Sequence, residues 1–326
     1  MISAKNNQAE FILQRNKPTH LNEILDDYYD DAVTPYEERA FKRVLRWKED
    51  FKDITEDYSH VTWEMLAAIV KAETQGKTGR QISKAMAVGM PQIKYQGAWA
   101  FFWDAAFSQK ITDGPLLVKD YYNARIRLRY RRQLNRINQY LKQEGILVIP
   151  SELSKSALAY RQARSDTWAN LKIHLRKNYQ PGEYQVAVDI AAMYIDHLID
   201  TFYQVKRQVS EIKQYVEQNQ ITGIDDIQVS GTKSIRLKRI KEYLVKKSEY
   251  ATSKNIQELT LTHINDILDR FEDPNIYSSA YNFGLKNTLD YIHSGKDWPK
   301  AIEDYANRVA TYNTIFMEIE KLSVFV

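Results

Sequence analysis

Apolar residues recur at helical spacing along much of the chain, and the most informative run ends in an acidic residue. In the segment 61–73, Leu66, Ile69, Val70 and Glu73 fall at positions i, i+3, i+4 and i+7, which places them on one face of an α-helix. The other residues of this face are apolar, so it is predicted to be buried. Burial of a carboxyl group raises its pKa, and a carboxyl that stays protonated near neutral pH can act as a general acid. Taken alone, the pattern is explained more simply by an exposed glutamate at a fraying helix end.

Other stretches share the helical period. Residues 38–51 carry apolar side chains at roughly helical spacing, and the long segments 119–141, 186–202 and 232–247 are helix candidates. The stretch 145–150 is predicted to be a short extended segment or turn. With 11 glycines and 8 prolines in 326 residues, few tight turns are available, which predicts a mostly α protein rather than an all-β one.

The composition excludes several kinds of catalytic and metal site but does not identify a binding partner. Hydrophobic residues make up 44% and charged residues 27% of the chain, as in ordinary soluble globular proteins. The absence of cysteine excludes disulfides, thiolate metal sites and a cysteine nucleophile. The six histidines show no zinc-ligand spacing, and neither a P-loop nor a dinucleotide-binding glycine pattern occurs. We therefore expect neither a metal nor a cofactor. A net charge of +4 favours anionic polymers such as cell-wall glycan or nucleic acid, without choosing between them.

The segments that follow Glu73 change the interpretation of that residue. A glycine-bearing loop (74–79) leads into S-K-A-M-A-V-G-M-P-Q-I (83–93), and later come a long helix candidate (186–202), S-A-Y-N-F-G (279–284) and Y-A-N-R-V (305–309). In this order the segments resemble the lytic transglycosylases of the soluble (Slt) type, which share the goose-type lysozyme fold. A-Y-N-F-G is the most specific of them, and the resemblance covers under half of the chain.

The resemblance implies a role for each matching position. Glu73 matches the catalytic acid/base, and Ser83 matches the serine that hydrogen-bonds it. Gln92 matches a glutamine that lines the sugar cleft, and a late tyrosine closes the site. The implied substrate-binding residues are Ser83, Gln92, Tyr281, Asn282 and Tyr305.

The chain departs from the family pattern at four positions. Thr74 replaces the usual serine after the glutamate, and Ala192 stands near the usual glycine of the long helix. Pro91 precedes Gln92 where the family usually has methionine, which stiffens the turn, and Lys94 replaces an apolar residue. The changes at Pro91 and Lys94 bear on subsite contacts more than on the chemistry.

The predicted organisation is a helical extension at 1–60 that packs on the core, and a lysozyme-like transglycosylase domain at 61–326. The domain has helical insertions at about 105–178 and 206–275. The first insertion contains an arginine-rich helix candidate. Its positive charge is compatible with three roles: binding nucleic acid, pairing with acidic neighbours, or forming a basic wall for substrate carboxylates. Of these, we do not expect nucleic-acid binding. Asp189 and Asp196 on the long helix are candidate second carboxylates, and for Asp189 a structural role is the simpler expectation.

The implied activity is cleavage of the β-1,4 bond between MurNAc and GlcNAc in peptidoglycan, with formation of 1,6-anhydro-MurNAc. The alternatives are a goose-type hydrolase that activates water and a non-catalytic cell-wall-binding or assembly protein on the same fold. The expected partners are glycan strands and a secretion or phage structural protein, and a monomer is favoured. The first residues contain no apolar signal-peptide core, and no apolar run is long enough to span a bilayer. We therefore expect action in the periplasm or cell wall after export by a secretion system, on a phage particle, or after lysis.

Overall fold

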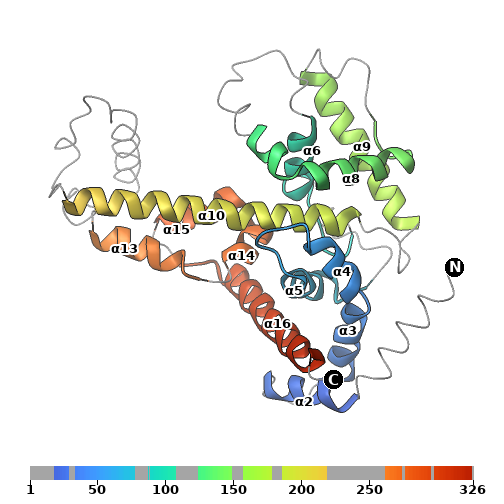
Figure 1. The fold of residues 1–326 in the computed structure, drawn as a ribbon, viewed down its shortest axis with the longest axis horizontal. Coiled ribbons are helices and arrows are strands. Elements are labelled where there is room, and N and C mark those ends of the chain that lie inside the picture. The colour runs from blue at the N-terminus through green and yellow to red at the C-terminus, as the bar shows by residue number, and fades with distance from the viewer. Residues whose placement is uncertain are drawn as a thin grey trace. The chain divides into compact units, whose positions relative to one another are not determined.

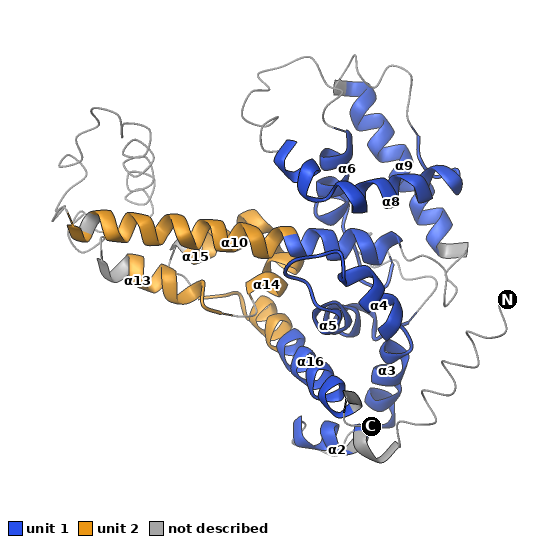
Figure 2. Cartoon of the chain, viewed as in Figure 1, with its two compact units in different colours: residues 1–196, 308–326 blue, residues 197–307 orange. Residues whose placement is uncertain are grey.

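The computed structural model describes ten stretches of the chain: 18–28, 34–77, 87, 89–107, 124–148, 157–177, 186–218, 261–273, 276–294 and 297–324. These residues are mostly helical and form no β-strand, which confirms the predicted mostly α class (Figure 1). The chain divides into two compact units, residues 1–196 with 308–326 (unit 1) and residues 197–307 (unit 2) (Figure 2). The predicted boundary between residues 60 and 61 falls inside unit 1.

The first helices of unit 1 form a tightly packed group. They are α2 (Pro18–Tyr28), α3 (Pro35–Leu45), α4 (Lys48–Thr55) and α5 (Trp63–Thr74). Helices α3 and α4 both pack against α5. Phe41, Val44, Trp47 and Phe51 are almost completely buried. These residues of the predicted N-terminal extension therefore contribute directly to the core around α5.

Helix α5 forms where the apolar period predicted it. Thr62 precedes it in an extended conformation, and the Thr62 side chain accepts a hydrogen bond from the amide of Met65, as N-cap residues do. Leu66, Ile69 and Val70 are fully buried, as the predicted apolar face requires.

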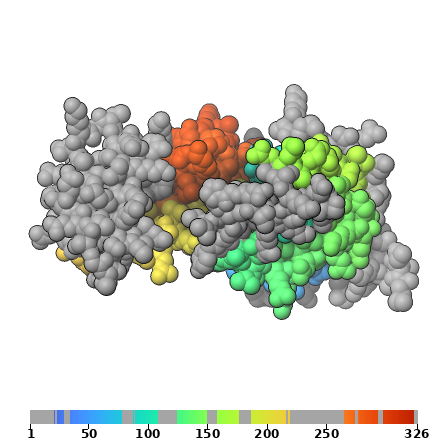
Figure 3. Space-filling view, turned by 90° about the horizontal axis from the view of Figure 1, so that it is seen from above, coloured from blue at the N-terminus to red at the C-terminus, as the bar shows by residue number. Residues whose placement is uncertain are grey.

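The rest of unit 1 is built around aromatic side chains. Its helices are α6 (Ala98–Phe107), α8 (Arg131–Gln143), α9 (Ala157–Lys177) and the first part of α10 (Val186–Gln218). Trp99 lies at the centre, with its ring 5.8 Å from that of Trp103 and 5.4 Å from that of Trp168. Helices α8 and α9 cross in the view of Figure 1, and the Tyr140 hydroxyl of α8 lies 2.8 Å from Nε2 of His174 in α9. Figure 3 shows their surfaces from above.

The arginine-rich segment is interrupted rather than forming the single helix predicted for 119–141. Residues 124–129 are helical, Tyr130 forms a turn with φ −102° and ψ 25°, and α8 follows. The Tyr130 side chain is buried and donates to Asp196, so an inward tertiary contact coincides with the break. Residues 119–123 lie outside the described residues. Residues 145–148 are not helical, as predicted.

Unit 2 contains the end of α10, α13 (Leu261–Arg270), α14 (Ile276–Phe283), α15 (Leu285–Ser294) and the start of α16 (Lys300–Val324). Gly284 joins α14 to α15 with φ +94°, a value that favours glycine, and the two helices pack on each other. The helix predicted at 232–247 lies outside the described residues.

Candidate active site

Glu73 lies in the last turn of α5, and the turn 89–92 lies beside that end of the helix. Glu73 is half-buried, while the next residue, Thr74, is buried. The Thr74 hydroxyl donates to the carbonyl of Met90 at 3.0 Å. The predicted acid and the predicted cleft-lining turn are thus next to each other in unit 1.

The turn 89–92 is tightly folded and approaches α10 closely. Gly89 has φ +77°, and a Cβ atom added there would lie 2.7 Å from the Cβ of Ala187, a separation that side chains do not tolerate. Gln92 also has a positive φ, +51°, which is uncommon for a residue with a side chain. Its amide nitrogen Nε2 donates to the carbonyl of Gly89 at 2.8 Å. The buried Gln92 side chain therefore closes its own turn.

The remaining predicted site residues fall elsewhere in the chain. Tyr281 is buried in α14, Asn282 beside it is half-buried, and Tyr305 is buried in α16. All three belong to unit 2, whereas Glu73 belongs to unit 1. Ser83 lies outside the described residues. Within one unit, the structure therefore brings together Glu73 and the turn of Gln92.

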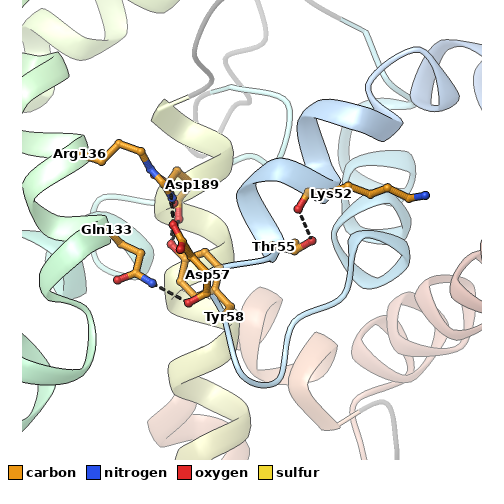
Figure 4. A network of polar contacts seen from close by, with 7 residues as sticks. All are labelled: Lys52, Thr55, Asp57, Tyr58, Gln133, Arg136 and Asp189. Atoms are coloured by element: carbon orange, nitrogen blue, oxygen red, sulfur yellow. Dashed lines mark hydrogen bonds and ion pairs between the residues drawn. The ribbon is translucent and has the colours of Figure 1, made fainter.

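The two acidic residues of α10 in unit 1 are both engaged by polar partners. Asp189 is fully buried and accepts from the guanidinium of Arg136 at 2.8 and 2.9 Å and from the Tyr58 hydroxyl at 2.6 Å (Figure 4). Arg136 also pairs with Asp57 at 2.7 Å. Gln133 donates to the backbone carbonyl of Asp57 at 2.7 Å, which ties the start of α8 to the chain after α4 (Figure 4).

Asp196 forms a second network of the same kind. Its carboxylate accepts from Arg129 at 3.0 Å, from the Tyr130 hydroxyl at 2.7 Å and from the backbone amide of His60 at 2.7 Å. Such contacts satisfy a buried carboxylate. The two carboxylates therefore have structural partners, and two arginines of the basic segment pair with acidic neighbours, as one of the predicted alternatives states.

A signal for these networks exists in the sequence but is easily missed. Arg129 and Arg136 are seven residues apart, and so are Asp189 and Asp196. Residues seven apart on an uninterrupted helix share one face, which holds for the two aspartates of α10, whereas the two arginines lie on either side of the turn at Tyr130. The first arginine pairs with the second aspartate and the second arginine with the first, so equal spacing allows both pairs to form between antiparallel segments.

A buried lysine in α5 also escaped the sequence analysis. The Lys71 side chain is fully buried and pairs with Glu37 of α3 at 2.5 Å. Its Nζ lies 4.7 Å from the ring centre of Phe41 and 4.3 Å from that of Tyr312. Burial lowers the pKa of Lys71, and the ion pair with Glu37 opposes that effect. The sequence signal for this buried ion pair is the position of Lys71 within an otherwise apolar stretch.

Neither metal-binding nor membrane-spanning features occur in the described part of the chain. It contains no group of three or more histidine or acidic side chains placed to hold a metal ion. None of its helices combines the length and apolar character needed to cross a bilayer.

Comparison with known proteins gives no match: no family model fits the chain, and no curated protein or solved structure matches it.

Proposed function

We propose that this protein is a lytic transglycosylase that cleaves peptidoglycan between MurNAc and GlcNAc in the periplasm or cell wall. The observation that carries the proposal is the hydrogen bond from Thr74 to Met90. It holds the end of the helix that carries Glu73 against the G-M-P-Q turn.

Three of the segments that carry the family resemblance adjoin one another in unit 1. They are the end of α5, the turn 89–92 and the start of α10, which Gly89 approaches through Ala187. The start of α10 is far from the other two segments in sequence, whereas Thr74 and Met90 are 16 positions apart. The contacts are made by the segments from which the resemblance was drawn. This coincidence supports the proposal independently of motif order.

In the proposed reaction Glu73 acts twice. As an acid it protonates the glycosidic oxygen, so that the bond between C1 of MurNAc and this oxygen breaks. As a carboxylate it then takes the proton from the C6 hydroxyl of the same MurNAc. The C6 oxygen attacks C1 and closes the 1,6-anhydro ring, and Glu73 ends in its protonated form. No water is consumed, so the second carboxylate of ordinary glycosidases is not required.

A mechanism with one carboxylate is supported by the state of the two candidate second carboxylates. The two acidic residues of α10 in unit 1, Asp189 and Asp196, form ion pairs with arginines. We therefore propose neither of them as the base that would activate a water molecule. We further propose that Gln92 helps to hold the sugar and its acetamido group. Ser83 orients the acid in this scheme. Tyr281, Asn282 and Tyr305 belong to unit 2, and the roles that the resemblance gives them stay predictions.

The deciding experiment is mass spectrometry of the products released from purified peptidoglycan. We expect muropeptides that end in 1,6-anhydro-MurNAc, each lighter by one water than a hydrolysed product and without a reducing end. Reducing ends that rise in step with cleavage would identify a goose-type hydrolase instead. Binding without any released product would identify a non-catalytic wall-binding protein.

A separate prediction concerns the exposed arginines of the basic segment. Arg125, Arg131 and Arg132 are exposed, whereas Arg129 and Arg136 form internal ion pairs. Replacing the three exposed arginines with glutamine should weaken retention on peptidoglycan roughly tenfold at low salt, because long-range attraction to an anionic polymer is lost. The difference should shrink as salt rises.

Cleavage of short soluble muropeptides by this triple variant should stay unchanged, since they depend little on long-range attraction. Equal losses on both substrates would mean that the segment is only structural. Retention of DNA in preference to peptidoglycan would favour a nucleic-acid partner.

A further inference from the structure

The chain turns sharply at Gln75 and Gly76, directly after the end of α5 and two residues beyond Glu73. Gln75 has φ +56° and ψ +34°, and Gly76 has φ +68°, so two successive residues adopt the left-handed conformation. Gln75 carries a side chain, and the left-handed region is sparsely populated by such residues. The amide of Gln75 donates to the carbonyl of Lys71 and that of Lys77 to the carbonyl of Thr74, both at 3.1 Å.

Two neighbouring residues of α3 contact this turn. The Arg43 Nε donates to the carbonyl of Gln75 at 3.0 Å. A Cβ atom added to Gly76 would lie 2.8 Å from Cγ2 and 2.9 Å from the backbone nitrogen of Val44. The backbone of the turn therefore rests directly on α3, and only glycine leaves room for that approach.

Further contacts hold the residues on either side of Glu73. Lys71, two positions earlier, is paired with Glu37 at the start of α3. Thr74, the next residue, donates to Met90. Helix ends otherwise fray, because their last carbonyls lack partners within the helix. Here the last turn of α5 is fixed to α3 before Glu73 and after it.

We infer that α3 is a clamp that positions Glu73, and that Arg43 is a positioning residue for the reaction proposed above, on which this inference rests. A general acid must stay within a fraction of an ångström of its productive place, and a displacement of 1 Å can cost about 100-fold in rate. Arg43 acts through the Gln75 carbonyl. The inference gives a role to part of the segment 1–60, for which the family resemblance assigns none.

The first test compares Arg43→Met with Arg46→Met. Both remove a guanidinium from neighbouring positions, and Arg46 is exposed. Arg43→Met should lower kcat by about 10- to 100-fold while KM changes by less than about twofold. Hydrogen exchange of the amides of residues 75–77 should speed up by about tenfold or more. Arg46→Met should match the wild type, and Arg43→Lys should recover part of kcat.

The second test compares Gly76→Ala with Gly145→Ala and does not depend on Arg43. Gly145 has φ +64°, close to the +68° of Gly76, and a Cβ atom there would meet nothing within 4 Å. Both substitutions carry the same backbone strain, but only the first collides with α3. Gly76→Ala should therefore reproduce the kcat loss and the faster exchange, and Gly145→Ala should not.

The inference is overturned if the Arg43 and Gly76 variants differ no more from wild type than their controls, or if the loss appears in KM. Unchanged amide exchange at 75–77 would overturn it as well. Failure of the proposed function has a different signature, since the wild type would then yield no anhydro product. In that case the amide-exchange measurement alone would test whether α3 holds the end of α5.

Discussion

Glu73→Gln is expected to lower the rate of peptidoglycan cleavage by at least about 10²–10⁴-fold, the usual cost of losing a general acid. The loss should lie at the upper end, because the same carboxyl also serves as the base in the proposed reaction. The amide keeps the shape of the side chain but cannot donate a proton as an acid does. Cleavage is measured by the release of soluble muropeptides from purified peptidoglycan.

Glu64→Gln is the matched control, because Glu64 lies in the first turn of the same helix and no role is proposed for it. Both variants should retain the circular dichroism spectrum and melting temperature of the wild type. If Glu73→Gln clears cell walls at nearly the wild-type rate, the assignment of the acid is wrong.

Arg136→Met is expected to lower the free energy of unfolding by about 3–5 kcal/mol, the cost of breaking a buried ion pair from one side. Asp189 is fully buried and loses two charge-assisted hydrogen bonds when the guanidinium is removed. Arg136 itself is only partly exposed, so solvent replaces it poorly. Urea unfolding followed by circular dichroism measures the effect.

Two further variants separate the ion pair from general damage to α8. Arg132→Met removes an exposed arginine of the same helix and should change stability by less than about 0.5 kcal/mol. The double variant Arg136→Met/Asp189→Leu should recover most of the loss, because no unpaired charge remains buried. In this double variant the Tyr58 hydroxyl can still donate its hydrogen bond to the backbone carbonyl of residue 189, which lies 3.1 Å away. A loss for Arg136→Met no larger than that for Arg132→Met would contradict the predicted contribution of the pair.

Local patterns in the sequence predicted a mostly α protein, the helix α5 and the place of Glu73 on it, but the helices α6, α9 and α13 to α16 were not predicted. The spacing of Leu66, Ile69 and Val70 predicted both α5 and its buried face, since a helix repeats every 3.6 residues wherever it packs. The position of Glu73 in the last turn followed from the same count. Its role as the catalytic acid rests on the resemblance and stays a prediction.

Equal spacing within each segment was visible in the sequence, but the partners were not. Pairing of the arginines with acidic neighbours was one of the predicted alternatives, but only the structure shows that Arg129 pairs with Asp196 and Arg136 with Asp189. Which acidic residues face an arginine depends on how two distant segments are brought antiparallel, and helical periodicity carries no information about that.

The surroundings of α5 were decided by tertiary structure alone. Residues 34–55 were predicted to pack on the core as part of an extension, but which residues they contact was not: α3 buries Lys71 and supports the turn after Glu73. Hydrophobic spacing identifies which face of a helix is buried, but burial is non-directional and does not select the element that covers it. That choice requires the path of the whole chain, because it brings Arg43 within hydrogen-bonding distance of Gln75, 32 positions away.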